Sequence, residues 1–427
     1  MRSASASHLP ARVDSAAAPG DPAALRVCLI TEELPPEAGW GGIGTYTQVL
    51  SRGLAELGHR VHVVARGWDA QDTADVDGVV VHRLLVPEPS WRRGARFIPH
   101  RFAETREVLA WGRRVARTVR RIAETERLDV IETPEYRAQG LLASRALPGV
   151  PLVVRLHTPS FLARRVSGVS VGGSRLDTMF SERMEHRLAR RASILTAPSR
   201  HLAGEVARAW RLDPDVIRVL PNPVEDDVFK PGEEEVDGRI LYVGRVSRIK
   251  GAESLVDAIS LIRPRFPQAR AVIAGPDHPT GSGGSMTEHL RARLRSAGVP
   301  ENLVDFRGPV DRALLPRVYG EAAVCVIPSL YESFSYTCLE AMAAGRAVVA
   351  SATGGLTELV TDGRDGLLVP PGDPGALAEA IGRLLADPAL RRRLGEAARK
   401  KALGFGRRTR CAESAELYRS LLGERVA

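Results

Sequence analysis

Short, largely apolar runs that alternate with helical patterns constrain this chain more than any other feature. Residues 25–30 and 60–65 are two such runs, and a helical pattern over residues 43–57 separates them. The same alternation starts again at residues 239–243, after a Pro- and Glu-rich stretch over residues 221–235. Buried strands separated by helices are typical of parallel sheets that are covered on both faces. The sequence therefore predicts an α/β fold built from two such units.

A chain of 427 residues is long enough for two domains. Residues 1–22 are rich in Ala, Ser and Pro and lack an apolar central region, so we expect a disordered tail rather than a signal peptide. Residues 23–222 are expected to form the first domain and residues 223–400 the second. Residues 401–427 are expected to contain a final helix.

Cysteine usage and the lengths of the apolar runs indicate where in the cell the protein is expected. No apolar run approaches the roughly 18 residues that a membrane-spanning helix needs. The four cysteines are scattered without metal-ligand spacing: Cys28, Cys325, Cys338 and Cys411. This usage is typical of a reduced protein, so we expect a cytoplasmic location.

The positive charge is concentrated in one segment. Between Arg92 and Arg127 there are 11 Arg and 4 Glu, which gives 11 − 4 = +7 of the formal net charge of +9. On a helical wheel an apolar stripe contains Val108, Trp111, Val115, Val119 and Ile122. The opposite face carries Arg113, Arg114, Arg117, Arg120 and Arg121.

Two interpretations of this arginine face stay open. It is a solvated outer face, or it docks anionic lipid headgroups at the inner face of the membrane or a phosphorylated acceptor. Nucleic acid is not expected as a partner, because the sequence has no nucleic-acid-binding module and no interleaved aromatic residues.

Two carboxylates, Glu332 and Glu340, flank the start of a predicted helix. Residues 322–327 read as a buried strand and residues 335–344 as the helix that follows. The eight-residue spacing spans at most about 12 Å along a helix. Free N–H groups at the helix start attract anions. The pair could therefore hold hydroxyls at the two ends of a nucleotide sugar while its diphosphate meets the helix.

This arrangement resembles the E-x7-E motif of the family-4 retaining glycosyltransferases. Residues 244–251 (GRVSRIKG) follow the strand over 239–243 and are similar to the family's phosphate-binding loop. Residues 345–350, 354–358 and 362–370 match the family in order and spacing, although Ser335 stands where the family usually has Gly. The resemblance implies the GT-B fold, in which two Rossmann-like domains face each other across a cleft and the C-terminal helix crosses back onto the first domain.

The resemblance also implies roles for individual residues. Arg245 and Lys250 would hold the donor diphosphate, Glu332 the sugar hydroxyls and Glu340 the ribose. His157 follows a predicted strand and would contact the donor sugar; a purely structural histidine is the alternative. The implied catalytic residues are Arg245, Lys250, Glu332 and His157. The further implied donor-binding residues are Gly42, Gly44, Gly244, Ser333, Phe334, Ser335 and Glu340.

Residues 39–44 match G-x-G-x-x-G, which alone would suggest a dinucleotide site. A loop separates this motif from the preceding strand, and Arg66 rather than an acid closes the next strand, which disfavours NAD but not NADP. A tight turn that caps the helix is another alternative. The family resemblance instead places the donor diphosphate there, beside the acceptor. The tentative acceptor-binding residues are Trp40, Tyr46, Glu132, Glu135 and Tyr136, and a solvated loop is the alternative for the last three.

Two Asp pairs, Asp75 with Asp77 and Asp213 with Asp215, fit a D-x-D metal pattern but lie in predicted turns. Because Arg245 and Lys250 can neutralise the charge of the phosphates, we expect neither a metal nor another cofactor.

The sequence thus predicts a retaining glycosyltransferase that moves a sugar from a nucleotide diphosphate sugar to an acceptor hydroxyl. Glycan, glycolipid and secondary-metabolite biosynthesis are all open contexts, and the acceptor is a sugar, a lipid-linked molecule or a small molecule. A GT-B nucleotide-sugar epimerase and a nucleotide-sugar-binding regulator without catalysis are the alternatives.

Overall fold

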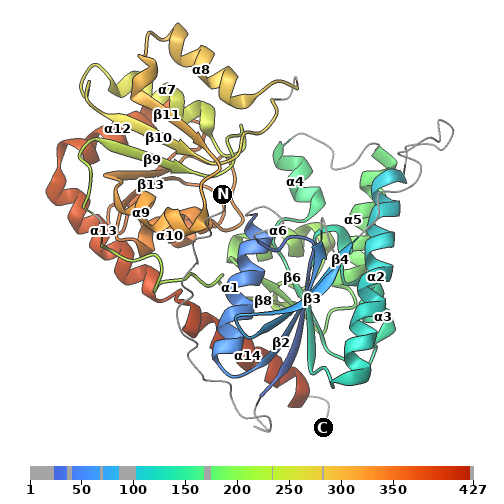
Figure 1. Cartoon of the computed structure of the whole chain (residues 1–427). Coiled ribbons are helices and arrows are strands. Elements are labelled where there is room, and N and C mark those ends of the chain that lie inside the picture. Colours follow the sequence, from blue (N-terminus) through green and yellow to red (C-terminus); the bar gives the residue numbers. More distant parts are fainter. Residues whose placement is uncertain are drawn as a thin grey trace, which may run out of the picture.

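The computed structural model describes residues 24–35, 41–67, 71–85, 102–167, 175–232, 234–280 and 283–423. The predicted tail and Trp40 lie outside these ranges. The described chain forms two units, each a sheet with helices packed on its faces (Figure 1). The prediction of an α/β protein with two Rossmann-like units is therefore confirmed.

The first sheet has eight strands in the order β3-β4-β2-β1-β5-β6-β7-β8. All neighbours are parallel except β3, which pairs antiparallel with β4. The strands are β1 (Arg26–Thr31), β2 (Arg60–Gly67), β3 (Asp72–Val76), β4 (Val79–Leu85), β5 (Val130–Pro134), β6 (Leu152–Arg155), β7 (Ile194–Ala197) and β8 (Ile217–Val219). The central strands are buried on both faces, which explains why they read as continuous apolar runs.

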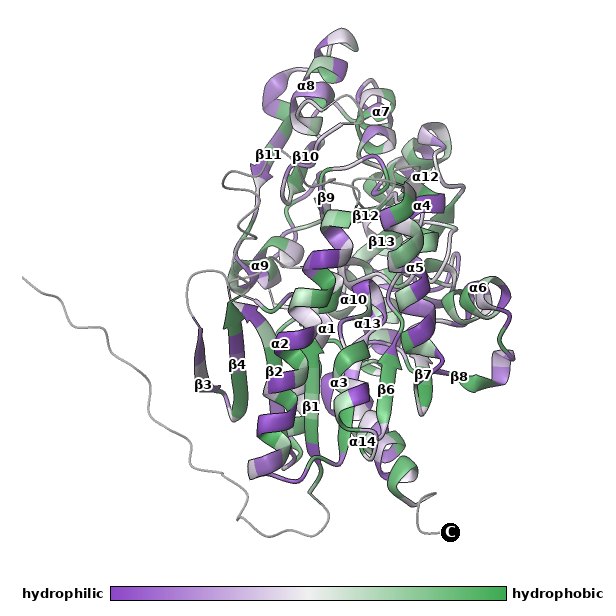
Figure 2. Ribbon diagram, turned by 90° about the vertical axis from the view of Figure 1, so that its right-hand side faces the viewer, coloured by the Kyte–Doolittle hydropathy of each residue, from purple (hydrophilic) through white to green (hydrophobic). Residues whose placement is uncertain are grey.

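Helices cover both faces of this sheet. They are α1 (Gly42–Glu56), α2 (Ala103–Thr125), α3 (Leu141–Ala146), α4 (Ser160–Ser167), α5 (Arg175–Ala189) and α6 (Arg200–Trp210), with the 3-10 turns η3 (Tyr136–Ala138) and η4 (Pro214–Val216). The predicted apolar stripe of α2 is buried against the sheet, with Trp111 at its centre. Figure 2 shows polar residues on the opposite side of α2.

The second sheet has six parallel strands in the order β11-β10-β9-β12-β13-β14. They are β9 (Arg239–Val243), β10 (Arg270–Ala274), β11 (Val304–Gly308), β12 (Val324–Ile327), β13 (Ala347–Ser351) and β14 (Leu367–Val369). The helices are α7 (Ala252–Ile262), α8 (Met286–Ser296), α9 (Leu315–Gly320), α10 (Tyr336–Ala343), α11 (Leu356–Leu359), α12 (Pro374–Ala386) and α13 (Pro388–Leu403), with η5 (Glu301–Leu303) and η6 (Arg312–Leu314).

The last helix, α14 (Arg407–Gly423), leaves the second unit and packs beside α1 of the first (Figure 1). Cys411, Ala415 and Tyr418 join the hydrophobic core formed by β1, β2 and α1. Gly53 of α1 lets the two helices approach closely, because a Cβ there would collide with the Cys411 sulfur. This contact ties the C-terminal end of the chain to the first sheet.

Within the described ranges, no helix combines the length and the apolarity needed to cross a bilayer.

Candidate active site between the two domains

The loop after β9 carries the predicted phosphate-binding residues. Gly244 has a φ of 146° and Gly251 a φ of 72°, so both adopt backbone conformations that favour glycine. A Cβ at Gly251 would also collide with the backbone oxygen of Pro328, the first residue after β12. The loop is thereby held against the next loop, while the Arg245 side chain stays exposed.

Lys250 and Glu332, which are 82 residues apart, meet in this structure. The Lys250 Nζ lies 2.7 Å from the Glu332 Oε1, and the Ser329 hydroxyl donates to the same oxygen over 2.9 Å. Glu332 is only 6% exposed. Its carboxylate is therefore fixed by a cation and a hydroxyl at the end of β12.

The helix that begins after Glu332 starts as predicted. Ser335 caps α10 by accepting a hydrogen bond from the backbone N–H of Cys338. Phe334 is partly buried against Phe405 of the same domain. The neighbouring Ser333 makes contacts to the first domain: its hydroxyl lies 2.7 Å from that of Thr158, and its backbone oxygen accepts the Ser199 hydroxyl over 2.8 Å. The loop after β12 and the loop after β6 are therefore in direct contact.

Glu340 lies on α10 away from this contact and is 3% exposed. Its two carboxylate oxygens accept from Arg312 Nη1 at 2.9 Å and from the Tyr319 hydroxyl at 3.0 Å. Burial raises the pKa of Glu340, and the Arg312 charge opposes the shift. Arg312 also donates to Glu225, in the segment that joins the two sheets, over 2.5 Å. The predicted ribose-binding carboxylate thus belongs to a buried charge network that sequence patterns did not indicate.

On the first domain, His157 follows β6. Its backbone N–H donates to both oxygens of Glu135, each at 2.9 Å. Its ring meets Tyr46 edge-on with centroids 5.2 Å apart, and its buried Nε2 has no hydrogen-bond partner. Burial, followed by the nearby Arg155 charge, lowers the pKa of His157 well below the ordinary value. A neutral imidazole with an unused nitrogen is thus available at this position.

Glu135 is completely buried and serves the backbone of the His157 loop rather than an exposed surface. Burial and the neighbouring Glu185 raise the pKa of Glu135 to about 8. Glu185, on α5, accepts from the Arg137 and Ser160 backbone N–H groups over 3.0 and 2.9 Å. Two buried carboxylates therefore hold the loops after β5 and β6. Tyr136 is half-buried, and burial raises its pKa to about 12.

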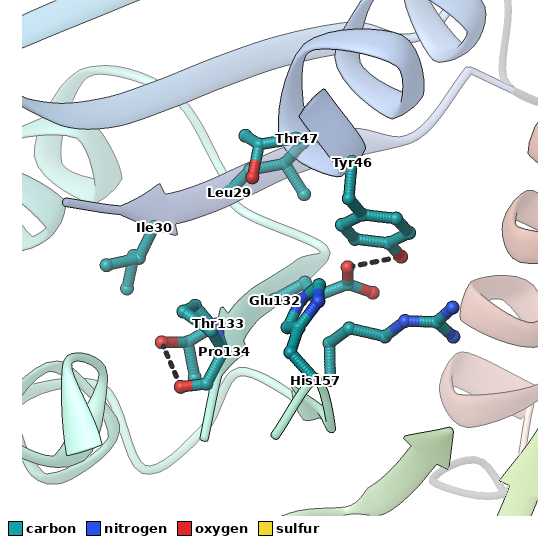
Figure 3. Close-up of a pocket in the computed structure, with 9 residues that line it drawn as sticks. Leu29, Ile30, Tyr46, Thr47, Glu132, Thr133, Pro134 and His157 are labelled. Atoms are coloured by element: carbon teal, nitrogen blue, oxygen red, sulfur yellow. Dashed lines mark hydrogen bonds between the residues drawn. The ribbon is translucent and has the colours of Figure 1, made fainter. Parts of the chain in front are cut away.

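Glu132 and Tyr46 lie deeper in the first domain (Figure 3). The Tyr46 hydroxyl donates to Glu132 Oε1 over 2.8 Å, and the Tyr418 hydroxyl of α14 donates to Oε2 over 2.7 Å. The Arg155 guanidinium lies 4.6 Å from the centroid of the Tyr46 ring. Figure 3 shows Tyr46, Glu132 and His157 converging on one small pocket. Both oxygens of Glu132 are thus engaged by tyrosines from α1 and α14.

The glycine-rich motif opens α1. Gly42 is exposed, and a Cβ there would meet open space, whereas Gly44 packs tightly against the backbone of Glu33. Arg66, near the end of β2, donates to Glu107 of α2 over 2.7 Å. Arg66 thus has a structural partner within the first domain.

The two Asp pairs close turns. Asp213 accepts the N–H of Asp215 over 3.0 Å, and Asp75 accepts that of Gly78 over 2.9 Å. Among the described residues, no group of three or more His, Cys, Asp or Glu side chains is arranged to hold a metal ion.

The predicted residues therefore form two opposed sets, which we name by domain. The C-terminal face comprises residues 244–251 and 328–335, and the N-terminal face comprises residues 32–35, 132–138 and 156–160. The hydrogen bond between Thr158 and Ser333 joins the two faces. Glu340 belongs to neither face, and Glu132, at the start of the range 132–138, directs its carboxylate to Tyr46 and Tyr418. Three further charged groups belong to no motif: Glu33 on the N-terminal face, Glu185, which binds backbone N–H groups of that face, and Arg312, which binds Glu340.

Two open α/β sheets whose loops meet in this way define the GT-B class of glycosyltransferases. The family model described as glycosyl transferases group 1 matches residues 237–387, and that described as glycosyltransferase family 4 matches residues 40–228. A D-inositol 3-phosphate glycosyltransferase of Kribbella flavida is 32% identical over 387 residues, which cover 86% of this chain and 87% of that protein. An uncharacterized glycosyltransferase of Methanocaldococcus jannaschii is 28% identical over 379 residues, covering 85% of this chain and 90% of that protein.

Solved structures agree on the fold. A sucrose-phosphate synthase from Thermosynechococcus elongatus superposes with a TM-score of 0.76 at 24% identity, covering 94% of this chain and 100% of that one. The Anabaena protein HepE in complex with UDP gives a TM-score of 0.69 at 21% identity, covering 93% and 100%. The chain belongs to glycosyltransferase family 4, and it is an enzyme that transfers a sugar from a nucleotide sugar.

Proposed function

We propose that this enzyme transfers its sugar with retention at the anomeric carbon and that the donor diphosphate is held by Arg245, Lys250 and the start of α10. The contact of Lys250 with Glu332 beside that helix start carries the proposal. Sugar transfer develops negative charge on the departing diphosphate, which fixed cations and helix N–H groups stabilise. Arginine offers a planar fork and lysine a point charge, so the two side chains complement each other.

The N-terminal face would supply contacts to the sugar. His157 presents a nitrogen without a partner, and Glu332 of the C-terminal face presents a carboxylate for sugar hydroxyls from the opposite side.

Glu340 would accept the ribose hydroxyls by exchanging one of its two present partners. Gly42 and Gly44 would let the diphosphate approach the start of α1.

Solved structures with this fold guide the choice of the nucleotide base in the donor. One solved structure of HepE is a complex with UDP, and the catalytic domain of starch synthase IV of Arabidopsis thaliana was solved bound to ADP. UDP- and ADP-sugars are therefore the donors to test first. The relatives named D-inositol 3-phosphate glycosyltransferases make that cyclitol phosphate the first acceptor to test. The anomeric signal of the product in a proton NMR spectrum decides between retention and inversion.

We further propose that no metal ion is needed, because Arg245 and Lys250 supply the positive charge. Turnover should survive EDTA unchanged. Loss of turnover that magnesium or manganese restores would overturn this part of the proposal.

We also propose that α2 binds an anionic membrane, the more specific of the two interpretations of its arginines. Four of these arginines are exposed and Arg114 is half-buried, and none forms an ion pair within the described part of the chain. Phe180, which stacks edge-on with Phe102 at the start of α2, is 42% exposed, and Leu176 and Met179 on the same helix are 46% and 45% exposed. These apolar side chains lie at the first turn of α2, and the arginines lie further along the same helix. Surfaces that bind lipid headgroups combine basic and apolar side chains.

Sedimentation with anionic liposomes at low salt tests this surface. Replacing Arg113, Arg117 and Arg120 by Gln should abolish binding and leave donor affinity unchanged. As a matched control, Arg392, Lys400 and Arg408, which are exposed on α13 and α14, are replaced by Gln. A wild-type protein that ignores anionic liposomes would leave a solvated face as the correct interpretation.

A further inference from the structure

The carboxylate of Glu33 lies against the start of α1. Glu33 follows β1, and its backbone is fixed by Thr31, whose hydroxyl donates to the Glu33 carbonyl over 2.8 Å and accepts its N–H over 3.1 Å. The side chain turns back toward the helix, because a Cβ placed on Gly41 would collide with the Glu33 carboxylate. The carboxylate therefore lies directly against Gly41, at the start of α1.

The free N–H groups at the start of α1 explain why the Glu33 carboxylate lies there. The first intrahelical bond of α1 runs from the Thr45 N–H to the Gly41 carbonyl, so the N–H groups of Gly42, Ile43 and Gly44 have no partner within the helix. The backbone N–H of Gly44 favours the charged form of the Glu33 carboxylate and so lowers its pKa. Helix starts of this kind attract any nearby anion.

A cation of the other domain acts electrostatically on the same carboxylate. Burial raises the pKa of Glu33, whereas the charge of Arg245 lowers it, and Glu32 raises it further. Arg245 is exposed on the C-terminal face. The Glu33 carboxylate thus lies against the start of α1 and is influenced by the charge of Arg245, and these are two of the groups proposed above to bind the donor diphosphate.

We propose that Glu33 competes with the donor for the start of α1, so that its carboxylate has to leave this position when a nucleoside diphosphate binds. The inference rests on the proposed function, because it takes the diphosphate to lie between α1 and Arg245. Two anions cannot share the same N–H groups without strong repulsion. Glu33 therefore weakens donor and product binding, and a weaker hold on the released nucleoside diphosphate favours its departure.

The test is a calorimetric titration of UDP, and of ADP, into the full-length chain in EDTA. We compare the wild type with Glu33→Gln, which removes the charge and keeps the shape, and with Glu33→Ala, which removes the whole carboxyl group. Both variants should bind the nucleotide about tenfold more tightly, since opposed like charges are costly even when partly screened. Glu56→Gln removes the same charge from the last turn of α1 and should leave the affinity unchanged.

Equal or weaker binding by both Glu33 variants, with a wild type that binds, would overturn this inference and leave the proposed function intact. The inference would also be overturned, and the proposed function kept, if the variants bind nucleotide as the wild type does but lose turnover. Glu33 would then act on the acceptor or the transition state. Absence of binding by the wild type and all variants would instead overturn the proposed function, and this inference with it.

Discussion

On the C-terminal face, Arg245 and Lys250 keep their charged ends within reach of solvent, and the Lys250 side chain is 26% exposed. On the N-terminal side, Glu132 and Glu135 are at most 5% exposed, and both bind groups of the protein itself. These two cations of the second domain are thus available to a ligand, whereas these two carboxylates of the first domain hold loops and helices. This difference predicts that mutations on the two sides act on different properties, catalysis in one case and stability in the other.

The largest effect is expected from the C-terminal face. Lys250→Ala and Arg245→Ala should each lower kcat by roughly 10²-fold or more, because their charges act most strongly when the diphosphate leaves. The thermal unfolding temperature of Arg245→Ala should change little, since Arg245 is exposed, whereas Lys250→Ala leaves the buried Glu332 carboxylate without its cation and should lower that temperature. Steady-state kinetics measure the first quantity, and near-normal turnover in both variants would contradict the assignment.

A smaller effect, on stability rather than chemistry, is expected for Glu132. Glu132→Leu leaves the Tyr46 and Tyr418 hydroxyls buried without an acceptor and should lower the free energy of unfolding by about 2 kcal/mol. Glu132→Gln, which keeps one acceptor oxygen, should cost less. Urea denaturation measures both variants. If both remain as stable as the wild type but lose turnover, Glu132 binds the acceptor after all.

The smallest effect concerns the pH dependence of stability. The pKa of Glu135 is raised to about 8 in the folded chain from an ordinary value of 4.5. Between these values the folded chain binds a proton that the unfolded chain does not, so the free energy of unfolding falls as the pH rises through this window. Glu135→Gln should flatten that fall. Thermal unfolding at several pH values tests it, and an unchanged slope would mean that Glu135 is ionised in the fold.

The fold was predictable because its signals are local. Residues 239–243 coincide with β9, and the helix expected over residues 335–344 starts one residue later behind its Ser335 cap. Strand burial and capping act over a few residues, so a pattern in one segment is enough.

The partners of the site residues were less predictable. Glu132 binds Tyr418, which is 286 residues away, and Glu340 binds Arg312, which belongs to no motif. Such contacts depend on how α14 crosses back and how η6 is placed, which are properties of the assembled chain. For the same reason the sequence assigned Glu132 and Glu135 to the acceptor, although here their carboxylates bind tyrosines and backbone N–H groups.

A thermal-unfolding titration with UDP and ADP tests the comparison between the two sides most directly, because it reports stability and ligand binding together. We predict that Arg245→Ala unfolds at the wild-type temperature without nucleotide and loses the nucleotide-induced rise. Glu132→Leu should unfold at a lower temperature and keep that rise. The converse pattern, with a destabilised Arg245→Ala that still responds and a stable Glu132→Leu that does not, would contradict the account.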